Sequence, residues 1–180
     1  MAIVRISISK FVAYLQWCYE NKCGYIMGAY GQNPRNWAAN SWWFTQYTGE
    51  QCEKALYWRE HAPLVMDCNG LAEGGYQKET GVNINARARN NYSSWCDPKG
   101  TGKVPAAHRV PGAAVFIHNG SYVSHVGFLW KPVITGKPEG DWWVIEARGV
   151  MYGVVATKLS ARGWNRWGLM TKYFDYSEEA

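Results

Sequence analysis

Cys68 is the residue whose type and position best fit nucleophilic chemistry. It lies in residues 65–71 (VMDCNGL), where a short apolar stretch gives way to an expected helix. The unpaired N–H groups and the dipole at a helix start favour negative charge, and therefore the thiolate, which is the nucleophilic form of cysteine. The same N–H groups can hold an oxyanion. The alternative is a buried structural cysteine, which is the usual state of a free cysteine.

A cysteine nucleophile needs a base, and the base needs a group that orients it. His125 is the candidate base because it stands in the middle of an expected strand, residues 122–128 (YVSHVGF). A histidine on an apolar sheet face is more often a core residue, but a rigid strand is also where a base would be held. His61 and His118 lie beside a helix end and a turn, where solvent exposure is expected, and His108 lies in a long loop.

Glu146 is the candidate orienting group. It lies among the apolar residues of the next expected strand, residues 142–147 (WWVIEA), and a buried carboxylate without a partner is costly. An imidazole N–H of His125 would satisfy this carboxylate and fix the tautomer of the histidine. A simple ion pair with Arg148 is the competing interpretation, and the residues alone leave both open.

Helices in the first half of the chain would carry the nucleophile. The apolar spacing predicts a helix over residues 9–23, capped by Ser9 and ended by Gly24. A capping-box pattern, TGEQ, predicts a second helix over residues 48–61. A third is expected over about 68–78, although two adjacent glycines weaken it.

The second half of the chain is expected to form strands that would carry the base and the carboxylate. An Asn-Gly pair at 119–120 is a strong hairpin signal, and residues 81–112 are expected to be a long loop. Strands are expected over residues 113–117, 122–130, 141–147 and 153–159. Helices followed by an antiparallel sheet predict an α+β fold.

Composition narrows the class of protein. The 180 residues can form one domain with a sizeable core, and 47% hydrophobic with 18% charged residues excludes intrinsic disorder. The longest purely apolar runs last five residues, whereas a membrane span needs about 18. We therefore expect no transmembrane segment, and the interrupted apolar start predicts no secretion signal.

Charge and cysteine spacing exclude several kinds of site. The net charge of +5 favours anionic partners, but no dense basic run indicates nucleic-acid binding. The five cysteines are irregularly spaced without a C-x-x-C pair, so we expect no metal and no cofactor. Residues 97–104 lack the first glycine and the final hydroxyl of a phosphate-binding loop. The eleven Trp residues suit a groove for sugars, peptides or proteins, or simply a Trp-rich core.

Five short motifs together resemble the NlpC-type cell-wall cysteine peptidases, which are papain-like enzymes that cut peptidoglycan stem peptides. The motifs are YxxGA at 25–29, DCNGL at 67–71, PGAAVF at 111–116, HVGF at 125–128 and VIEA at 144–147. Their order is specific, and the resemblance spans roughly residues 9–159. It implies a papain-like α+β fold, with N-terminal helices packed on a C-terminal antiparallel sheet and the nucleophile at a helix N-terminus.

The resemblance also implies roles for individual residues. Cys68 becomes the nucleophile and His125 the general base. Glu146 becomes the orienting residue, at a position where the family most often has histidine. No metal ion enters this chemistry.

Three further residues match substrate-binding positions of the family. Tyr25 matches a tyrosine that lines the active site, and Asp67 matches an acidic residue that helps bind substrate. Asn69 follows the nucleophile where the family usually has serine, which leaves the recognition of the stem peptide open. We expect residues 1–180 to form a single papain-like domain with a Trp-rich insertion at about 32–63, which would be a lid, a substrate wall or packing.

The resemblance implies hydrolysis of peptidoglycan stem peptides, foremost at the bond between D-γ-glutamate and a diamino acid. An amidase cut between muramic acid and L-alanine would use the same residues. One alternative is a non-catalytic module that holds a glycan or a protein in its Trp-rich groove. Another is papain-like deamidation or acyl transfer on a different substrate.

The partner expected from the resemblance is bacterial peptidoglycan, bound by a monomer of bacterial or phage origin. We expect no nucleic acid and no membrane span. The protein would be made in the cytoplasm without a signal peptide and would act at the cell wall after phage-mediated or non-standard release.

Overall fold

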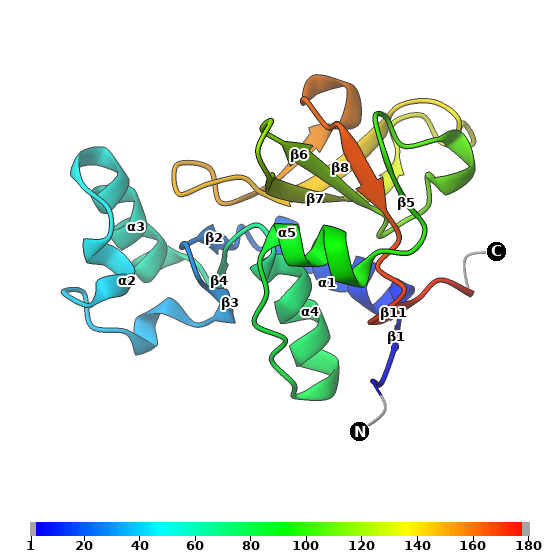
Figure 1. Ribbon diagram of the computed structural model, residues 1–180. Coiled ribbons are helices and arrows are strands. Elements are labelled where there is room, and N and C mark those ends of the chain that lie inside the picture. The colour runs from blue at the N-terminus through cyan, green and yellow to red at the C-terminus, as the bar shows by residue number, and fades with distance from the viewer. Residues whose placement is uncertain (1–2, 178–180) are drawn as a thin grey trace.

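The computed structural model describes residues 3–177 and has the predicted α+β fold. Figure 1 shows a layer of strands that includes β6, β7 and β8 above a layer that includes helices α1, α4 and α5, with α2 and α3 to one side. The helices are α1 Ile8–Glu20, α2 Trp42–Thr45, α3 Gly49–His61, α4 Gly70–Thr80 and α5 Ala88–Asn90, with the short helical turns η1 Pro34–Asn36, η2 Asn91–Trp95, η3 Ala106–His108 and η4 Leu159–Ala161.

The strands form three sheets. They are β1 Ile6–Ser7, β2 Gly24–Tyr25, β3 Tyr30–Gln32, β4 Val65–Met66, β5 Lys99–Thr101, β6 Ala114–His118, β7 Val123–Pro132, β8 Trp142–Ala147, β9 Val154–Lys158, β10 Arg166–Gly168 and β11 Phe174–Asp175. The large sheet is antiparallel with the order β5-β10-β6-β7-β8-β9. A small sheet with the order β2-β4-β3 leads into α4, and β1 pairs with β11.

Helix α1 packs on the inner face of the large sheet and holds the main core. The Phe11 ring meets the Phe128 ring of β7 edge-on at 5.1 Å and the Phe174 ring at 4.7 Å. Ser7, rather than the expected Ser9, is the N-cap, and the helix ends at Glu20, before Gly24. The burial of Phe11 and its neighbours fixes this helix more firmly than its caps do.

The other two predicted helices are present. In α3 the cap residue Thr48 makes no side-chain hydrogen bond to the described residues, so the capping-box bond is absent although the helix forms. In α4 the two glycines that weakened the prediction serve close packing. A Cβ on Gly74 would lie 2.5 Å from the Tyr14 hydroxyl and one on Gly75 would lie 2.8 Å from Phe11. Helix α4 can therefore approach α1 only because these positions lack side chains.

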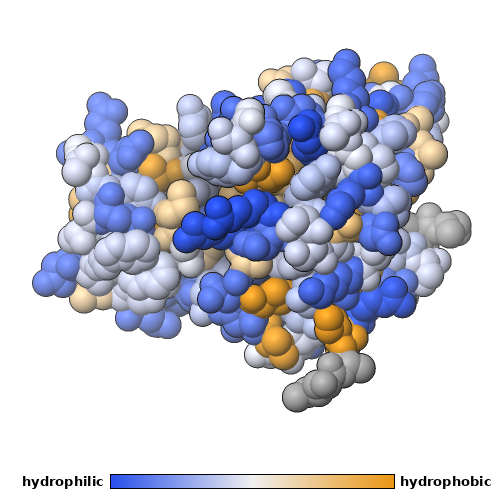
Figure 2. Space-filling model, viewed as in Figure 1, coloured by the Kyte–Doolittle hydropathy of each residue, from blue (hydrophilic) through white to orange (hydrophobic). Residues whose placement is uncertain are grey.

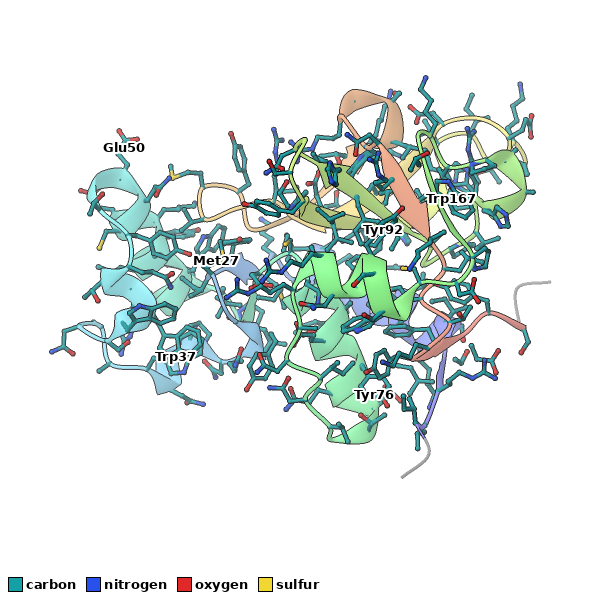
Figure 3. The ribbon with its side chains drawn as sticks, in the orientation of Figure 1. Met27, Trp37, Glu50, Tyr76, Tyr92 and Trp167 are labelled. Carbon is teal, nitrogen blue, oxygen red and sulfur yellow. The ribbon has the colours of Figure 1, made fainter. Side chains whose placement is uncertain are left out.

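The prediction of a continuous loop over residues 81–112 was wrong. This stretch contains α5, η2, β5 and η3. Figure 3 labels Tyr92 of η2, whose ring meets the Phe116 ring of β6 edge-on at 5.2 Å. Short polar elements of this kind carry little periodicity, because their order comes from packing against the sheet.

The outer face of the large sheet carries a second apolar core. Trp142, Trp164 and Trp167 pack there against aliphatic residues that include Leu129 and Val144. Trp167, labelled in Figure 3, belongs to β10, which the sequence did not reveal as a strand. Several tryptophans are thus core residues, as the plainer interpretation of the composition held.

The outside of the molecule is mostly hydrophilic in the view of Figure 2. Ile3, Val4 and Val82 are among the exposed apolar residues and lie around one shallow groove. Within residues 3–177 no helix combines the length and the apolar character needed to cross a membrane.

Candidate active site

Cys68 and His125 line the same cavity, although 57 positions separate them in the sequence. The cavity has a volume of about 640 Å³. Cys68 lies between β4 and the start of α4, whose N-cap is Asn69. His125 lies on β7, and the backbone N–H of the next residue, Val126, lowers the pKa of the Cys68 thiol. The fold therefore brings the predicted nucleophile and base to one place.

Burial changes the acidity of the Cys68 thiol in the direction opposite to the one that its helix-start position predicts. Burial, followed by the negative charge of the adjacent Asp67, raises the pKa of Cys68 to about 12. The backbone N–H groups of Val126, Asn69 and Cys68 itself lower this pKa by less. The resting thiol is therefore protonated at neutral pH, and the expectation of a preformed thiolate was wrong because desolvation outweighs the helix dipole.

This acidity can be measured through alkylation. Iodoacetamide reacts with thiolates, so the alkylation rate of Cys68 is expected to keep rising above pH 9, beyond the value of about 8.5 for a free cysteine. Mass spectrometry of peptides after timed labelling separates Cys68 from Cys52, the other partly exposed cysteine. Circular dichroism at each pH checks that the fold persists. A rate that levels off below pH 8 would contradict the raised pKa.

The predicted contact between base and carboxylate is present. The Nε2 atom of His125 lies 2.6 Å from Oε2 of Glu146, which is fully buried on β8. The Thr157 hydroxyl donates to Oε1 of Glu146 at 2.7 Å, and Nη2 of Arg162 donates to Oε2 at 3.0 Å. Burial alone would raise the pKa of Glu146, but hydrogen bonds from His125 and Thr157 and the charges of His125 and Arg162 lower it below its ordinary value. Glu146 is therefore held as a carboxylate.

The competing partner, Arg148, does not bind Glu146 through any described contact. Its guanidinium lies 4.3 Å from the centre of the Tyr152 ring. Arg162 takes the place that the sequence offered to Arg148. Arg148 follows Ala147, the last residue of β8, and so lies outside the strand that carries Glu146.

Trp164 fixes the plane of the base. Its indole stacks on the His125 ring with centroids 5.6 Å apart and an angle of 17° between the rings. A Cβ on Gly127, two positions after His125, would lie 2.8 Å from the Trp164 ring and 2.7 Å from Val144. The glycine of the HVGF motif therefore leaves room for the indole that supports the histidine.

Replacing Glu146 with glutamine tests this arrangement. Glutamine keeps the shape but loses the charge that favours the protonated imidazole, so we expect hydrolytic turnover to fall about 10²-fold to 10⁴-fold. The lowered pKa of Glu146 stabilises the folded state above the unfolded value of about 4.3, and this contribution is lost as the pH falls through the folded pKa. Urea titrations between pH 3 and 7 should show that the variant lacks this dependence.

Glu79→Gln is the matched control for this experiment. Glu79 pairs with Lys10 at 3.0 Å on the surface, far along α4 from Cys68. Surface pairs contribute at most about 1 kcal/mol, so both turnover and stability should change little. Equal losses of turnover in the two variants would contradict the role of Glu146.

The other histidines have separate surroundings. His108 stacks on Trp167 at 4.5 Å, and Nδ1 of His118 accepts the N–H of Gly120 at 3.1 Å. His61 stacks on Tyr57 in α3. None of the three lines the cavity of Cys68.

Tyr25 and Asp67, two of the predicted substrate-binding residues, also line the cavity. Burial, followed by the nearby Cys68 and Asp67, raises the pKa of Tyr25, so its hydroxyl stays protonated. Both oxygens of Asp67 accept backbone N–H groups, from Gly28 at 3.0 Å and from Gly70 at 2.7 Å. Asp67 therefore fastens the loop after β2 to the start of α4, in addition to facing the cavity.

Asn69, the third predicted substrate-binding residue, has its side chain in the interior. It is 1% exposed, donates to Glu73 at 3.0 Å and accepts from Asn91 at 2.9 Å. Its amide also donates to the Ala86 carbonyl at 3.2 Å. Asn69 nevertheless lines the cavity together with Tyr25 and Asp67, and its side-chain bonds tie α4 to the segment before β5.

The Trp-rich segment supplies both packing and one wall of the cavity. The Trp37 and Trp43 rings stack at 4.1 Å, whereas Trp42 is 60% exposed and lines the cavity. Met27 lies on the same side, and its N–H donates to the Tyr47 hydroxyl at 2.7 Å. Figure 3 labels Met27 and Trp37 on the side of the molecule that carries α2 and α3.

Sequence reasoning missed several residues of the site. Thr157, Arg162 and Trp164 support the histidine and the carboxylate, and Arg87 and Arg89 are exposed and line the cavity. Only Thr157 had a usable signal, because it alternates with its neighbours on an expected strand. Arg162 and Trp164 lie in an irregular segment, and Arg87 and Arg89 lie at and within the three-residue helix α5, which is too short for spacing to reveal direction.

Comparisons with known proteins identify a family and a similar fold. The family model described as the NlpC/P60 family matches residues 45–172. The crystal structure of the NlpC/p60 domain of the peptidoglycan hydrolase SagA is similar with a TM-score of 0.52 and 15% sequence identity, over 92% of this chain and 100% of that one. No curated protein matches the chain. At 15% identity the structural similarity shows the papain-like fold.

Proposed function

Because the chain belongs to the NlpC/P60 family, we propose that it is a cysteine peptidase that hydrolyses peptidoglycan stem peptides through an acyl-enzyme on Cys68. The observation that carries this proposal is the shared cavity of Cys68 and His125, together with the 2.6 Å contact between His125 and Glu146. These three residues would supply the nucleophile, the base and the orienting carboxylate that acyl transfer requires.

The proposed reaction begins from a protonated thiol. His125 takes the proton of Cys68 as the sulfur attacks the amide carbonyl, and Glu146 stabilises the imidazolium that forms. Backbone N–H groups at the start of α4 hold the oxyanion, at about 3 kcal/mol per donor. His125 then gives its proton to the departing amine. Water activated by His125 releases the acyl group and restores the thiol.

The walls of the cavity suit an anionic peptide. Arg87 and Arg89 place two exposed cations on one side, and Trp42 and Tyr122 place exposed rings on the cavity wall. Stem peptides carry free carboxylates next to their γ-linked glutamate, and arginine binds carboxylates well. The bond between D-γ-glutamate and the diamino acid is therefore the proposed target, with peptidoglycan as the partner.

Digestion of purified peptidoglycan tests the proposal. Walls containing each of the two common diamino acids are incubated with the protein, and mass spectrometry identifies the released fragments. New termini at D-γ-glutamate support the endopeptidase, and free stem peptides beginning with L-alanine would indicate the amidase cut instead. Binding without new fragments from either wall would contradict hydrolysis and favour a binding module.

A further inference from the structure

A second cavity, distinct from the one that holds Cys68, lies beside the outer core of the large sheet. It has a volume of about 280 Å³ and shares no lining residue with the first. Its walls come from three separated segments, at residues 103–109, 140–141 and 159–164. Trp164, which stacks on His125, is one wall, so this cavity lies behind the base.

Cations dominate the lining of this second cavity. Lys103, Arg109 and Arg162 line it together with one carboxylate, Asp141, and Arg162 is also paired with Glu146. Both oxygens of Asp141 already accept hydrogen bonds from Ser160. Positive charge is therefore in excess within a small concave space.

Two of the three cations have no carboxylate partner among residues 3–177. Arg109 donates only to backbone carbonyls, those of Val104, Glu139 and Gly140. Lys103 is exposed and takes part in none of the ion pairs of the described residues. The charges of Lys103 and Arg109 are therefore available to bind an anion.

Two buried donors of the same cavity also lack an acceptor within the described part of the chain. They are the Nε atom of Arg162 and the indole Nε1 atom of Trp164, a residue that is 7% exposed. Buried N–H groups almost always have a partner, and these two donors lie beneath the accessible wall of the cavity, on residues that form it. Arginine, lysine and indole N–H groups are all donors without acceptor capacity.

We propose that this cavity binds a phosphate group. Its three cations, two of them without a carboxylate partner among residues 3–177, match an anion with several acceptor oxygens and a charge of up to about −2. A phosphate group directs its oxygens tetrahedrally toward the three separate segments of the lining, which a planar carboxylate does not do. The group can come from free inorganic phosphate or from a phosphodiester of an anionic polymer, and the two sources share the same contacts.

Two existing contacts connect the second cavity to His125 and Glu146. Arg162 donates to Glu146 at 3.0 Å, and Trp164 stacks on His125. An anion that binds Arg162 would weaken the ion pair between Arg162 and Glu146. Binding itself requires no hydrolysis, so the inference goes beyond the proposed peptidase function and does not depend on it.

The test follows the indole N–H of Trp164 by NMR. The ¹⁵N-labelled protein is titrated at pH 7 with inorganic phosphate, with chloride at equal ionic strength as the salt control, and Trp164→Phe identifies the signal. We expect a saturable shift with phosphate and none with chloride. A parallel titration with a glycerol phosphodiester shows whether the site also accepts the polymer form.

Charge variants then locate the binding. Lys103→Ala and Arg109→Gln should each weaken phosphate binding about tenfold, which corresponds to the loss of one good ionic contact. Lys137→Ala removes an exposed cation that does not line the cavity and should leave binding unchanged. Because Arg109 also holds the 139–140 segment, Lys103→Ala keeps the test valid if Arg109→Gln misfolds.

Two results would overturn the inference. One is the absence of a saturable shift of the Trp164 signal with both the phosphate and the phosphodiester. The other is equal binding by the Lys103→Ala and Lys137→Ala variants. Neither result bears on hydrolysis at Cys68, since the same titration can be run on a Cys68→Ala protein.

Discussion

Replacing Cys68 with alanine is expected to lower stem-peptide hydrolysis at least about 10⁴-fold, because the acyl-enzyme cannot form without the sulfur. The fold should survive, since the side chain is small and only partly buried, at the wall of a cavity. Release of muropeptides over time, measured by chromatography and mass spectrometry, gives the rate. A Cys68→Ser variant keeps the size of the side chain and should be nearly as inactive, because a hydroxyl is a far weaker nucleophile than a thiol at neutral pH.

Cys52→Ala is the matched control for the nucleophile. Cys52 is the other partly exposed cysteine, and it lies in α3 away from the cavity of Cys68. The control should keep its full rate. If Cys68→Ala retained more than about one tenth of the activity, the acyl-enzyme mechanism would be contradicted.

Replacing His125 with alanine is the second change with a large expected effect. We expect turnover to fall about 10³-fold to 10⁴-fold, because a thiol with a pKa of about 12 does not ionise at neutral pH without a base. Added imidazole should restore part of the rate, since the variant leaves room beside Trp164 and Glu146. Rates at several imidazole concentrations, near neutral pH, measure this rescue.

His118→Ala controls for the loss of a histidine. His118 lies on β6, with its ring bonded to the Gly120 N–H and outside the cavity of Cys68. It should neither slow turnover nor respond to imidazole. Similar losses in both variants would show that the base had been placed wrongly.

The raised pKa of Cys68 has a consequence for both experiments. A neutral thiol at rest requires that proton transfer accompany attack on the carbonyl, so the base and the nucleophile act in one step. Burial, followed by the charge of Asp67, raises the pKa of the Cys68 thiol and so adds to the cost of a thiolate. Asp67 also fastens the loop to α4, so the residue that positions the nucleophile is one of those that raise its pKa.

The sequence was sufficient to predict those site residues that stand in a recognisable local pattern. Cys68 stands where an apolar run meets a helix start, and His125 and Glu146 alternate along apolar strands. These signals depend on the side-chain periods of a strand, two residues, and of a helix, 3.6 residues. Both periods follow from backbone geometry and can be recognised without knowing the tertiary structure. The α+β order of elements, the hairpin between β6 and β7, and the family motifs were available in the same way.

The tertiary structure alone decided which groups complete the site. Arg162 and Trp164 reach Glu146 and His125 from an irregular segment, and their contacts depend on how that segment folds over the sheet. Burial engages the Asn69 side chain in bonds to the interior and raises the pKa of the Cys68 thiol, against the helix-start argument. Desolvation and long-range contact are properties of the packed chain, so no local pattern of residues could carry them.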